Sequence, residues 1–328
     1  MPERRVRAMS VSALWEFLLR RRSALCAACI LCLLIMAALA APLYAHVIGV
    51  DPMESNLAGS VMRNGTMQDV MQANDNPLHL GLSPIGPSWR WGAYALGADS
   101  QGRDVAARLL YGGRSSLLIA ISAACLSLIA ATSCGLIAGY CGGWVDLLIS
   151  RLLDILWAVP VYLFAISLSV VTIGHDLSLG PFHLSADSLL LPIVIIALIY
   201  VPYAARPIRA RTKSLSNAGF VLAARGLGAS SWRIVLREIL PLLAETVLVL
   251  APLIMALCLL AESALSFLSL GVQAPAASWG SLIHDGEGLI YSRPVVAIAP
   301  GLAIIVTVLC LNALGDAAQA ELRAKGQR

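Results

Sequence analysis

Residues 24–50 of the sequence read ALCAACILCLLIMAALAAPLYAHVIGV, a run of apolar residues with no Asp, Glu, Lys or Arg. A helix of this length crosses the ~30 Å hydrocarbon layer of a membrane. The run follows three arginines at positions 20–22, so the start of the chain also has features of a cleavable signal peptide. The apolar part of a signal peptide, however, is only about 7–15 residues long. We therefore expect residues 24–50 to be an uncleaved membrane anchor.

The composition of the whole chain also indicates membrane-spanning segments. Of its 328 residues, 59% are hydrophobic and 13% are charged, whereas soluble domains have about 45–50% apolar and about 25% charged residues. Gly, Pro and charged residues separate the apolar segments, as expected between membrane spans. The sequence predicts an all-α, polytopic membrane protein with six transmembrane helices, and it leaves little chain for a separate soluble domain. Five further apolar runs follow the first, at about 115–140, 152–173, 189–203, 242–270 and 295–314.

The distribution of arginine predicts the orientation of the chain. Six arginines precede the first span, and the connection between the fourth and fifth spans contains six arginines and one lysine. Six spans place both segments on one side, and basic connections stay on the cytoplasmic side. Both termini are therefore expected in the cytoplasm, with the chain in the inner membrane of a bacterial cell. The predicted parts are a cytoplasmic tail (1–23), the first anchor (24–50), a periplasmic loop (51–114), a five-helix core (115–315) and a cytoplasmic tail (316–328).

Residues 219–241, GFVLAARGLGASSWRIVLREILP, have a helical pattern but are not apolar enough to span a membrane. Gly228 interrupts the pattern, and Ser230 can cap a second helix after it. The sequence thus predicts two short helices joined at Gly228, here called the elbow, on the cytoplasmic side. Small residues such as Ala223 and Ala224 let another backbone approach, so the elbow suits insertion into a groove of a partner. The alternative is an amphipathic helix that rests on anionic lipid through its arginines.

The elbow resembles the cytoplasmic signature of the permease subunits of binding-protein-dependent ABC importers, which reads EAA, three residues and Gly, and ends in Leu-Pro. Leu222, Ala223 and Ala224 stand at the EAA positions, and Gly228 stands at the glycine. Leu222 replaces the glutamate of the signature, whereas the small residues are kept. In that family the segment docks an ATPase subunit. The resemblance implies an ATPase-docking role for Leu222, Ala223, Ala224, Arg225, Gly228, Ala229, Ser230 and Arg233.

Two further segments resemble the smaller permease of the peptide and nickel importers. The first, residues 97–117, reads GADSQGRDVAARLLYGGRSSL and is similar to the pattern GTDxxGRDxxSRLxYGxRxSL, with two alanines in place of hydroxyl residues. We expect a helix that enters the outer membrane interface with Asp99 as its N-cap. The segment is either a packed collar for the second span or a direct part of substrate passage. In the second reading, Asp99, Arg103 and Asp104 belong to the translocation path or its outer gate.

The second of these segments, residues 262–280, reads ESALSFLSLGVQAPAASWG and resembles the pattern ESxLSFLGLGVQPPxPSWG. It begins with Glu262, inside the fifth predicted span. A charged group at membrane depth costs roughly 2.5–3.5 kcal/mol on insertion scales and usually faces a bundle interior or a water-filled path. Glu262 is therefore either a structural hydrogen-bonding group or part of the lining of the translocation path.

The sequence offers no catalytic, cofactor-binding or metal site. The only two lysines, Lys213 and Lys325, do not follow a glycine, so the phosphate-binding GxxxxGK[ST] loop is absent. HExxH and GxSxG motifs are also absent. Cys26, Cys29 and Cys32 form a CxxCxxC motif without an adjacent His or carboxylate to complete a metal site. The net charge of +4 is too small to indicate nucleic-acid binding.

The resemblance implies a permease subunit of an ABC importer, which does no chemistry itself. Such a subunit lies in membrane lipid and forms half of a translocation path with a second homologous permease, while two ATPase subunits hydrolyse ATP with Mg. An external solute-binding protein, periplasmic or at the cell surface, delivers the ligand. Peptides, nickel chelates, opines and sugars all remain open as solutes. The alternative is a secondary transporter or channel subunit, which would show related halves or several intramembrane ionisable residues, and neither is clear here.

Overall fold

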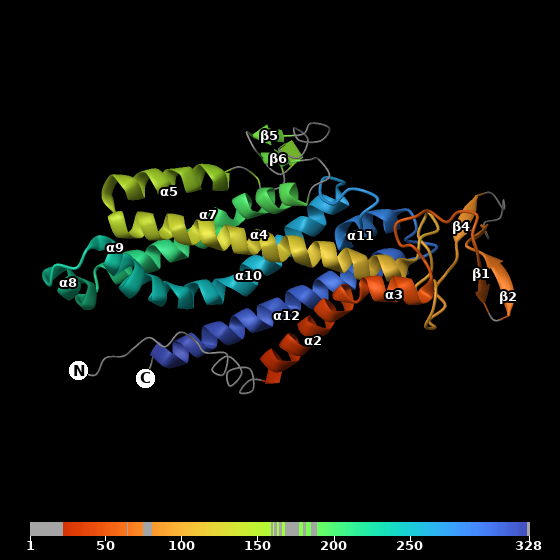
Figure 1. Ribbon diagram of the computed structural model, residues 1–328, viewed down its shortest axis with the longest axis horizontal. Coiled ribbons are helices and arrows are strands. Elements are labelled where there is room, and N and C mark those ends of the chain that lie inside the picture. Colours follow the sequence, from red (N-terminus) through yellow and green to blue (C-terminus); the bar gives the residue numbers. More distant parts are fainter. Residues whose placement is uncertain are drawn as a thin grey trace.

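The computed structural model is an elongated bundle of helices with small β-hairpins at one end (Figure 1). It describes residues 22–63, 65–74, 81–158, 160, 163, 166–167, 177–179, 182–184 and 189–326. The predicted all-α membrane fold is confirmed, because several described helices are long and apolar enough to cross a membrane. Within the described ranges there are five such segments: Arg22–Leu39, Val105–Cys141, Leu190–Ser216, Ser231–Phe267 and Val295–Leu322.

Half of the third predicted span, residues 152–173, lies outside the described residues. Helix α5 (Gly143–Ala158) covers its first part and begins before it. Further along, the short strands β5 (Leu177–Leu179) and β6 (Phe182–Leu184) pair antiparallel. A sixth span at residues 152–173 therefore stays a prediction.

The sequence suggested one continuous helix for the first apolar run, but the structure has two. Helix α2 (Arg22–Leu39) ends near Ala40, and helix α3 (Ala41–Ile48) continues from there in a new direction (Figure 1). The cause is Pro42 in the first turn of α3, since proline has no N–H to donate to the preceding turn. Eighteen residues of α2 extend about 27 Å, which is close to the thickness of the hydrocarbon layer.

Three spans continue beyond the predicted apolar runs, and one of them is the last span, α12 (Val295–Gly326). Helix α4 (Val105–Cys141) begins at Val105 rather than near residue 115, and helix α7 (Leu190–Ser216) continues past residue 203. The 37 residues of α4 extend about 55 Å, well beyond a ~30 Å hydrocarbon layer. Helix α4 therefore projects toward the hairpins, and α7 projects toward the opposite end of the bundle (Figure 1).

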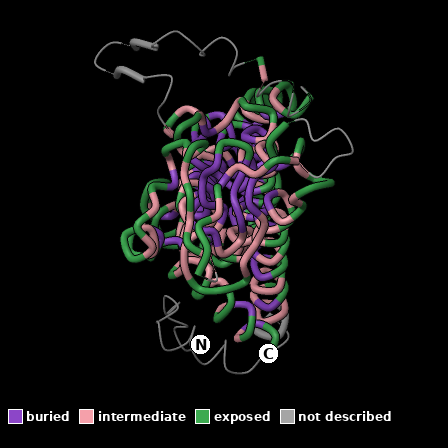
Figure 2. The backbone as a smooth tube through the Cα atoms, turned by 90° about the vertical axis from the view of Figure 1, so that its right-hand side faces the viewer, coloured by how far each residue is buried: buried purple, intermediate pink, exposed green. Residues whose placement is uncertain are grey.

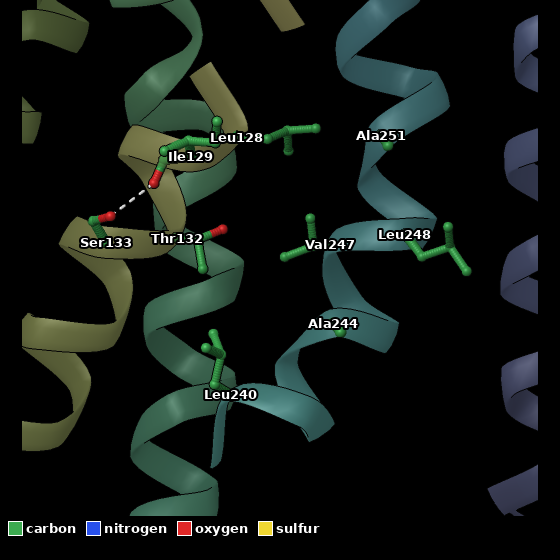
Figure 3. Close-up of a pocket in the computed structure, with 9 residues that line it drawn as sticks. All are labelled: Leu128, Ile129, Thr132, Ser133, Leu240, Ala244, Val247, Leu248 and Ala251. Atoms are coloured by element: carbon green, nitrogen blue, oxygen red, sulfur yellow. Dashed lines mark hydrogen bonds between the residues drawn. The ribbon is translucent and has the colours of Figure 1, made fainter. Parts of the chain in front are cut away.

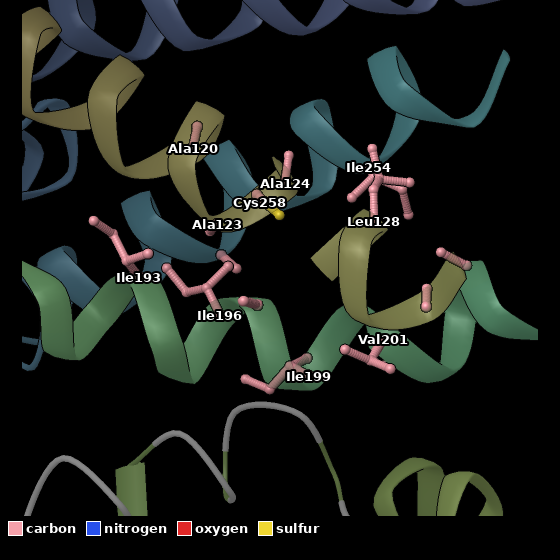
Figure 4. Packing of buried hydrophobic residues seen from close by; sticks show 14 of the residues in the cluster. Ala120, Ala123, Ala124, Leu128, Ile193, Ile196, Ile199, Val201, Ile254 and Cys258 are labelled. Atoms are coloured by element: carbon pink, nitrogen blue, oxygen red, sulfur yellow. The ribbon is translucent and has the colours of Figure 1, made fainter. Parts of the chain in front are cut away.

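The core lies between α4, α7 and α10 (Leu240–Phe267), and Figure 2 shows the buried residues at the centre of the bundle. Glycines bring α4 and α7 close together. A Cβ atom at Gly139 would lie 2.6 Å from Cβ of Thr212, and one at Gly135 would lie 2.8 Å from Cγ2 of Ile208. Small residues at such contacts are typical of membrane helices, where close packing replaces the hydrophobic effect as the driving force. The apolar contacts in Figure 4 involve Ala120, Ala123, Ala124 and Leu128 of α4, Ile193, Ile196, Ile199 and Val201 of α7, and Ile254 and Cys258 of α10.

The loop between α3 and α4 forms two antiparallel hairpins. One pairs β1 (Ser60–Arg63) with β2 (Thr66–Asp69), and the other pairs β3 (Met71–Ala73) with β4 (Leu82–Pro84). At the same end of the bundle, the short helix α11 (Trp279–Glu287) precedes the last span, α12 (Val295–Gly326) (Figure 1). Tyr44 of α3 also reaches this loop, where its hydroxyl donates to the Gly92 carbonyl oxygen at 3.3 Å. This end of the molecule is therefore a folded cap over the helices.

Candidate functional site

The elbow begins with helix α8 (Gly219–Gly226), which projects at the end opposite the hairpins (Figure 1). After it, Gly228 has a φ of +79°, the left-handed conformation in which a side chain costs roughly 1–2 kcal/mol. Ser230 then caps the following helix by accepting a hydrogen bond from the Arg233 N–H at 3.4 Å. The predicted break at Gly228 and cap at Ser230 are both confirmed.

The second half of the elbow differs from the prediction. It is not a separate short helix, because α9 (Ser231–Arg233) continues through a π-helical segment, η1 (Ile234–Ile239), directly into α10. The wider π-helical turn accommodates one more residue per turn and is often found at functional sites. The elbow is thus a short helix, a left-handed turn at Gly228 and an extension of the spanning helix α10.

The elbow has an inner and an outer face. Val221, Ile234 and Ile239 are buried against the bundle. On the outer face, Leu227 is 89% exposed and Trp232 is 72% exposed. Several exposed apolar side chains on one short projecting segment indicate a site for a partner. The outer face is the set of exposed elbow residues, and its large apolar members are Phe220, Leu222, Leu227, Trp232 and Leu236.

The predicted docking residues divide between these two faces. Ala224 and Ala229 are half-buried and pack against the core. The remaining predicted residues are exposed, namely Leu222, Ala223, Arg225, Gly228, Ser230 and Arg233. Leu227 and Trp232 were not predicted as docking residues, although they flank the Gly228–Ser230 turn. Leu227 directly precedes the helix-breaking Gly228, and Trp232 lies two residues after the cap Ser230. These positions could have identified both residues in the sequence.

A second candidate site is a buried ion network at the hairpin end of the bundle. Asp99 accepts from Nε of Arg103 at 2.7 Å, and Asp285 of α11 accepts from Nη2 of Arg103 at 2.9 Å. Arg108 of α4 contacts the same two carboxylates, at 3.4 Å and 2.9 Å. Both arginines and Asp99 are buried, and Asp285 is partly exposed. The network therefore joins the outer loop, the start of α4 and α11.

The N-cap of α4 is Asp104 and not Asp99, so that prediction was wrong. Oδ1 of Asp104 accepts from the Ala107 N–H at 2.8 Å, and its other oxygen accepts from the Tyr94 N–H. Asp99 instead accepts from the N–H groups of Gln101 and Arg103 within the preceding turn. Both aspartates satisfy the spacing of a cap, and the tertiary contact with Tyr94 favours the later one. Burial raises the pKa of Asp104, while its hydrogen bonds from backbone N–H groups oppose that shift.

Glu262 of α10 is fully buried and surrounded by serine hydroxyls. Ser266 donates to Oε1 at 2.8 Å. The Ser263 hydroxyl lies 3.4 Å from Oε2 and donates to the Leu259 carbonyl oxygen at 2.9 Å. Ser116 of α4 and Ser278, which caps α11, also hydrogen-bond to this carboxylate. This arrangement links three helices and agrees with the structural alternative for Glu262. A role for Glu262 in solute passage stays a prediction.

An apolar groove of about 460 Å³ lies between α4 and α10, toward the elbow end of these helices (Figure 3). Its polar groups are few, and the Ser133 hydroxyl already donates to the Ile129 carbonyl oxygen at 2.9 Å. None of the four predicted path residues lines this groove. The lining residues could not be identified from the sequence, because most of them are Leu, Ile, Val and Ala, which occur throughout membrane spans. They are Leu128, Ile129, Thr132, Ser133, Leu240, Ala244, Val247, Leu248 and Ala251.

A bundle of membrane helices closely packed through glycines, with an exposed apolar elbow at one end, defines a polytopic membrane protein. The chain belongs to the family of binding-protein-dependent transport system inner membrane components, whose family model matches residues 131–325. It is the membrane permease subunit of an ABC importer.

Curated relatives extend the match toward the N-terminus of the chain. The dipeptide transport system permease protein DppC of Alkalihalophilus pseudofirmus is 36% identical over 244 residues, which cover 74% of each chain. The glutathione transport system permease protein GsiD of Pectobacterium atrosepticum is 36% identical over 231 residues, covering 70% of this chain and 71% of the relative. The oligopeptide transport system permease protein OppC of Haemophilus influenzae is 37% identical over 225 residues, covering 69% and 68%.

Solved structures show the same fold at low sequence identity. An inward-facing structure of the MetNI methionine ABC transporter contains a chain that matches with a TM-score of 0.52 and 16% identity. The match covers 65% of this chain and 95% of that chain. At this identity the likeness concerns the fold alone.

Proposed function

We propose that this chain forms half of the membrane path for a peptide or a related small solute. A second homologous permease supplies the other half, and an external solute-binding protein delivers the solute. The relatives whose names include dipeptide, glutathione and oligopeptide transport support this solute class. ATP and Mg act in partner subunits and not in this chain.

Two ATPase subunits dock at the elbow, one on each permease. The single observation that carries this proposal is the exposed outer face of the elbow, where Leu227 and Trp232 are the most exposed apolar side chains. The bundle itself leaves this face uncovered, so a groove on a partner subunit can bury it. Arg233 and Arg237 are exposed on the same segment and favour an acidic rim on that groove.

The elbow and both termini lie on the cytoplasmic side of the bacterial inner membrane in this proposal. The C-terminal end of α12 lies at the same end of the bundle as α8, while the hairpins lie at the other end (Figure 1). This arrangement supports the orientation derived from the basic connections.

The ion network and Glu262 form the outer closure of the path. Asp99, Arg103 and Asp104 hold the outer loop on α4 and α11, and Glu262 holds α10 to the same group through serines. Each of these groups is buried within the chain. We therefore assign them a structural role, which is to stabilise the packing of this closure.

Reconstitution tests the proposal. The chain would be purified with its permease, ATPase and binding-protein partners and placed in proteoliposomes, where uptake of labelled dipeptides and of a nickel chelate is compared. We expect ATP-dependent peptide uptake that requires the binding protein. Uptake driven by an ion gradient without ATP would contradict the docking proposal, and uptake of the nickel chelate alone would contradict the proposed solute.

A further inference from the structure

Arg225 sits in the last turn of α8, and its guanidinium turns back toward the bundle. Its Cζ atom lies 5.2 Å from the centroid of the Tyr140 ring, near the end of α4. A cation this close to an aromatic ring is attracted by the negative charge on the face of the ring. Within the described part of the chain, Arg225 forms no ion pair. The ring is therefore the contact that orients this side chain.

Tyr140 lies in a corner of the molecule where α4, α5 and α7 contact one another. Its neighbour Gly139 packs directly on α7, where an added Cβ would lie 2.8 Å from the Arg209 carbonyl oxygen. The chain then turns into α5, and Asp146 at the start of α5 forms a bidentate ion pair with Arg209 of α7. Three helices are thus tied together beside Tyr140.

The Tyr140 ring, and not its hydroxyl, makes this contact. The hydroxyl oxygen is buried and has no hydrogen-bond partner. A group without a partner contributes no hydrogen bond to the fold, so phenylalanine should replace tyrosine here without loss. The comparison of Phe and Leu at position 140 isolates the effect of the aromatic face.

The other attachments of α8 are small. Val221 is its buried residue, and Ala224 and the following Ala229 pack against the core with single methyl groups. Loss of the Arg225 contact would leave α8 held mainly by Val221. The position of α8 relative to α4 therefore depends on the stacking of Arg225 on Tyr140.

We propose that Arg225 is a positioning residue that fixes the elbow to the corner of α4, α5 and α7 through the Tyr140 ring. Movement of a docked ATPase is then passed to α4, and through Gly139 to α7, instead of being absorbed by rotation of α8. The proposal rests on the proposed function of the elbow for its consequence in transport. The contact itself can be tested in the purified chain without a partner.

The partner-independent test is hydrogen–deuterium exchange of residues 219–226 in detergent-purified protein. Exchange of this segment should become roughly twofold to fivefold faster in Tyr140→Leu and in Arg225→Ala, as expected from the loss of one exposed cation–π contact. Tyr140→Phe should match the wild type. Arg233→Ala is the matched control, because it removes the same charge from the elbow without a ring contact. Unchanged exchange in Tyr140→Leu would overturn the proposal.

The second test separates positioning from docking in the complex. Tyr140→Leu should still co-purify with the ATPases, but transport per ATP hydrolysed should fall several-fold, and the double variant with Arg225→Ala should be no worse than either single variant. Loss of co-purification in Arg225→Ala but not in Tyr140→Leu would make Arg225 a direct ATPase contact and contradict the proposal. Failure of the wild-type chain to bind any ATPase would instead defeat the proposed function, while the exchange result would still decide the positioning role.

Discussion

At the scale of single residues, Gly228 shows how a local conformation creates the elbow. Its φ of +79° favours glycine, yet an ideal Cβ at this position would meet no atom within 4 Å. The constraint is therefore in the backbone and not in packing. Gly226, two residues earlier, also has free space around its Cβ position but shows no positive φ. The pair offers a matched comparison.

Gly228→Glu should insert normally into the membrane but lose ATPase association and uptake, because it strains the turn and places a charge on the apolar outer face. Gly228→Ala should show a partial loss, in line with a strain of roughly 1–2 kcal/mol. Gly226→Ala should bind the ATPases like the wild type. Co-purification from membranes measures all three. Full ATPase recovery in Gly228→Glu would mean that the elbow is only a lipid-surface helix.

Asp104 shows a residue that sequence spacing alone misplaced. Replacing it with alanine removes the cap of α4 and leaves the Tyr94 N–H without a partner, so we expect about 1–3 kcal/mol lower stability. Asp104→Asn keeps an oxygen for the Ala107 N–H and should lose less. Thermal unfolding in detergent measures the difference. Equal midpoints for the Asn and Ala variants would show that the cap contributes nothing.

At the scale of elements, α4 and α7 are held together by direct backbone approach. Gly139→Ala would place a methyl group 2.6 Å from Cβ of Thr212, so the helices must separate. Overpacking of this kind typically costs about 1–3 kcal/mol. We expect a lower unfolding midpoint for Gly139→Ala, whereas Gly301→Ala in α12, where the Cβ position is open, should not lower it. An unchanged midpoint in Gly139→Ala would contradict the packing account.

Local signals were the predictable part of this structure. The apolar runs located the described spans, and Gly228 and Ser230 located the elbow, because a helix break and a cap depend on neighbouring residues. Hydropathy marks only the part of a helix inside the hydrocarbon layer, so it missed the start of α4 at Val105. It also missed the break at Pro42, which lies within an unbroken apolar run.

Long-range pairing was not predictable from the sequence. Asp285 meets Arg103 across 182 positions and Arg108 across 177. Nothing near these residues in the sequence specifies that meeting, because it depends on how α11 packs on α4. The serines around Glu262 come from separate helices for the same reason. Spacing can therefore propose a cap or a turn, but it cannot identify the partners of a buried charge.

At the scale of the whole molecule, the hairpin cap and the elbow lie at opposite ends of the bundle, and we propose that the cap is outside and the elbow in the cytoplasm. Ser214 lies near the end of α7 on the elbow side and is exposed, whereas Met62 lies on the outer hairpin and is 70% exposed. A cysteine at position 62 should react with a membrane-impermeant thiol reagent in cells whose inner membrane is intact. A cysteine at position 214 should react only after permeabilisation. Labelling of position 214 in intact cells would reverse the topology.

The central claim is that the outer face of the elbow is buried against an ATPase subunit. Leu227 is its most exposed apolar residue and lies at the turn, so a photoreactive amino acid placed there reports directly on what covers it. Trp91, 82% exposed in the outer loop, is the matched control position. We predict that illumination of membranes cross-links position 227, but not position 91, to an ATPase subunit. Adducts of position 227 with lipid alone would contradict the claim.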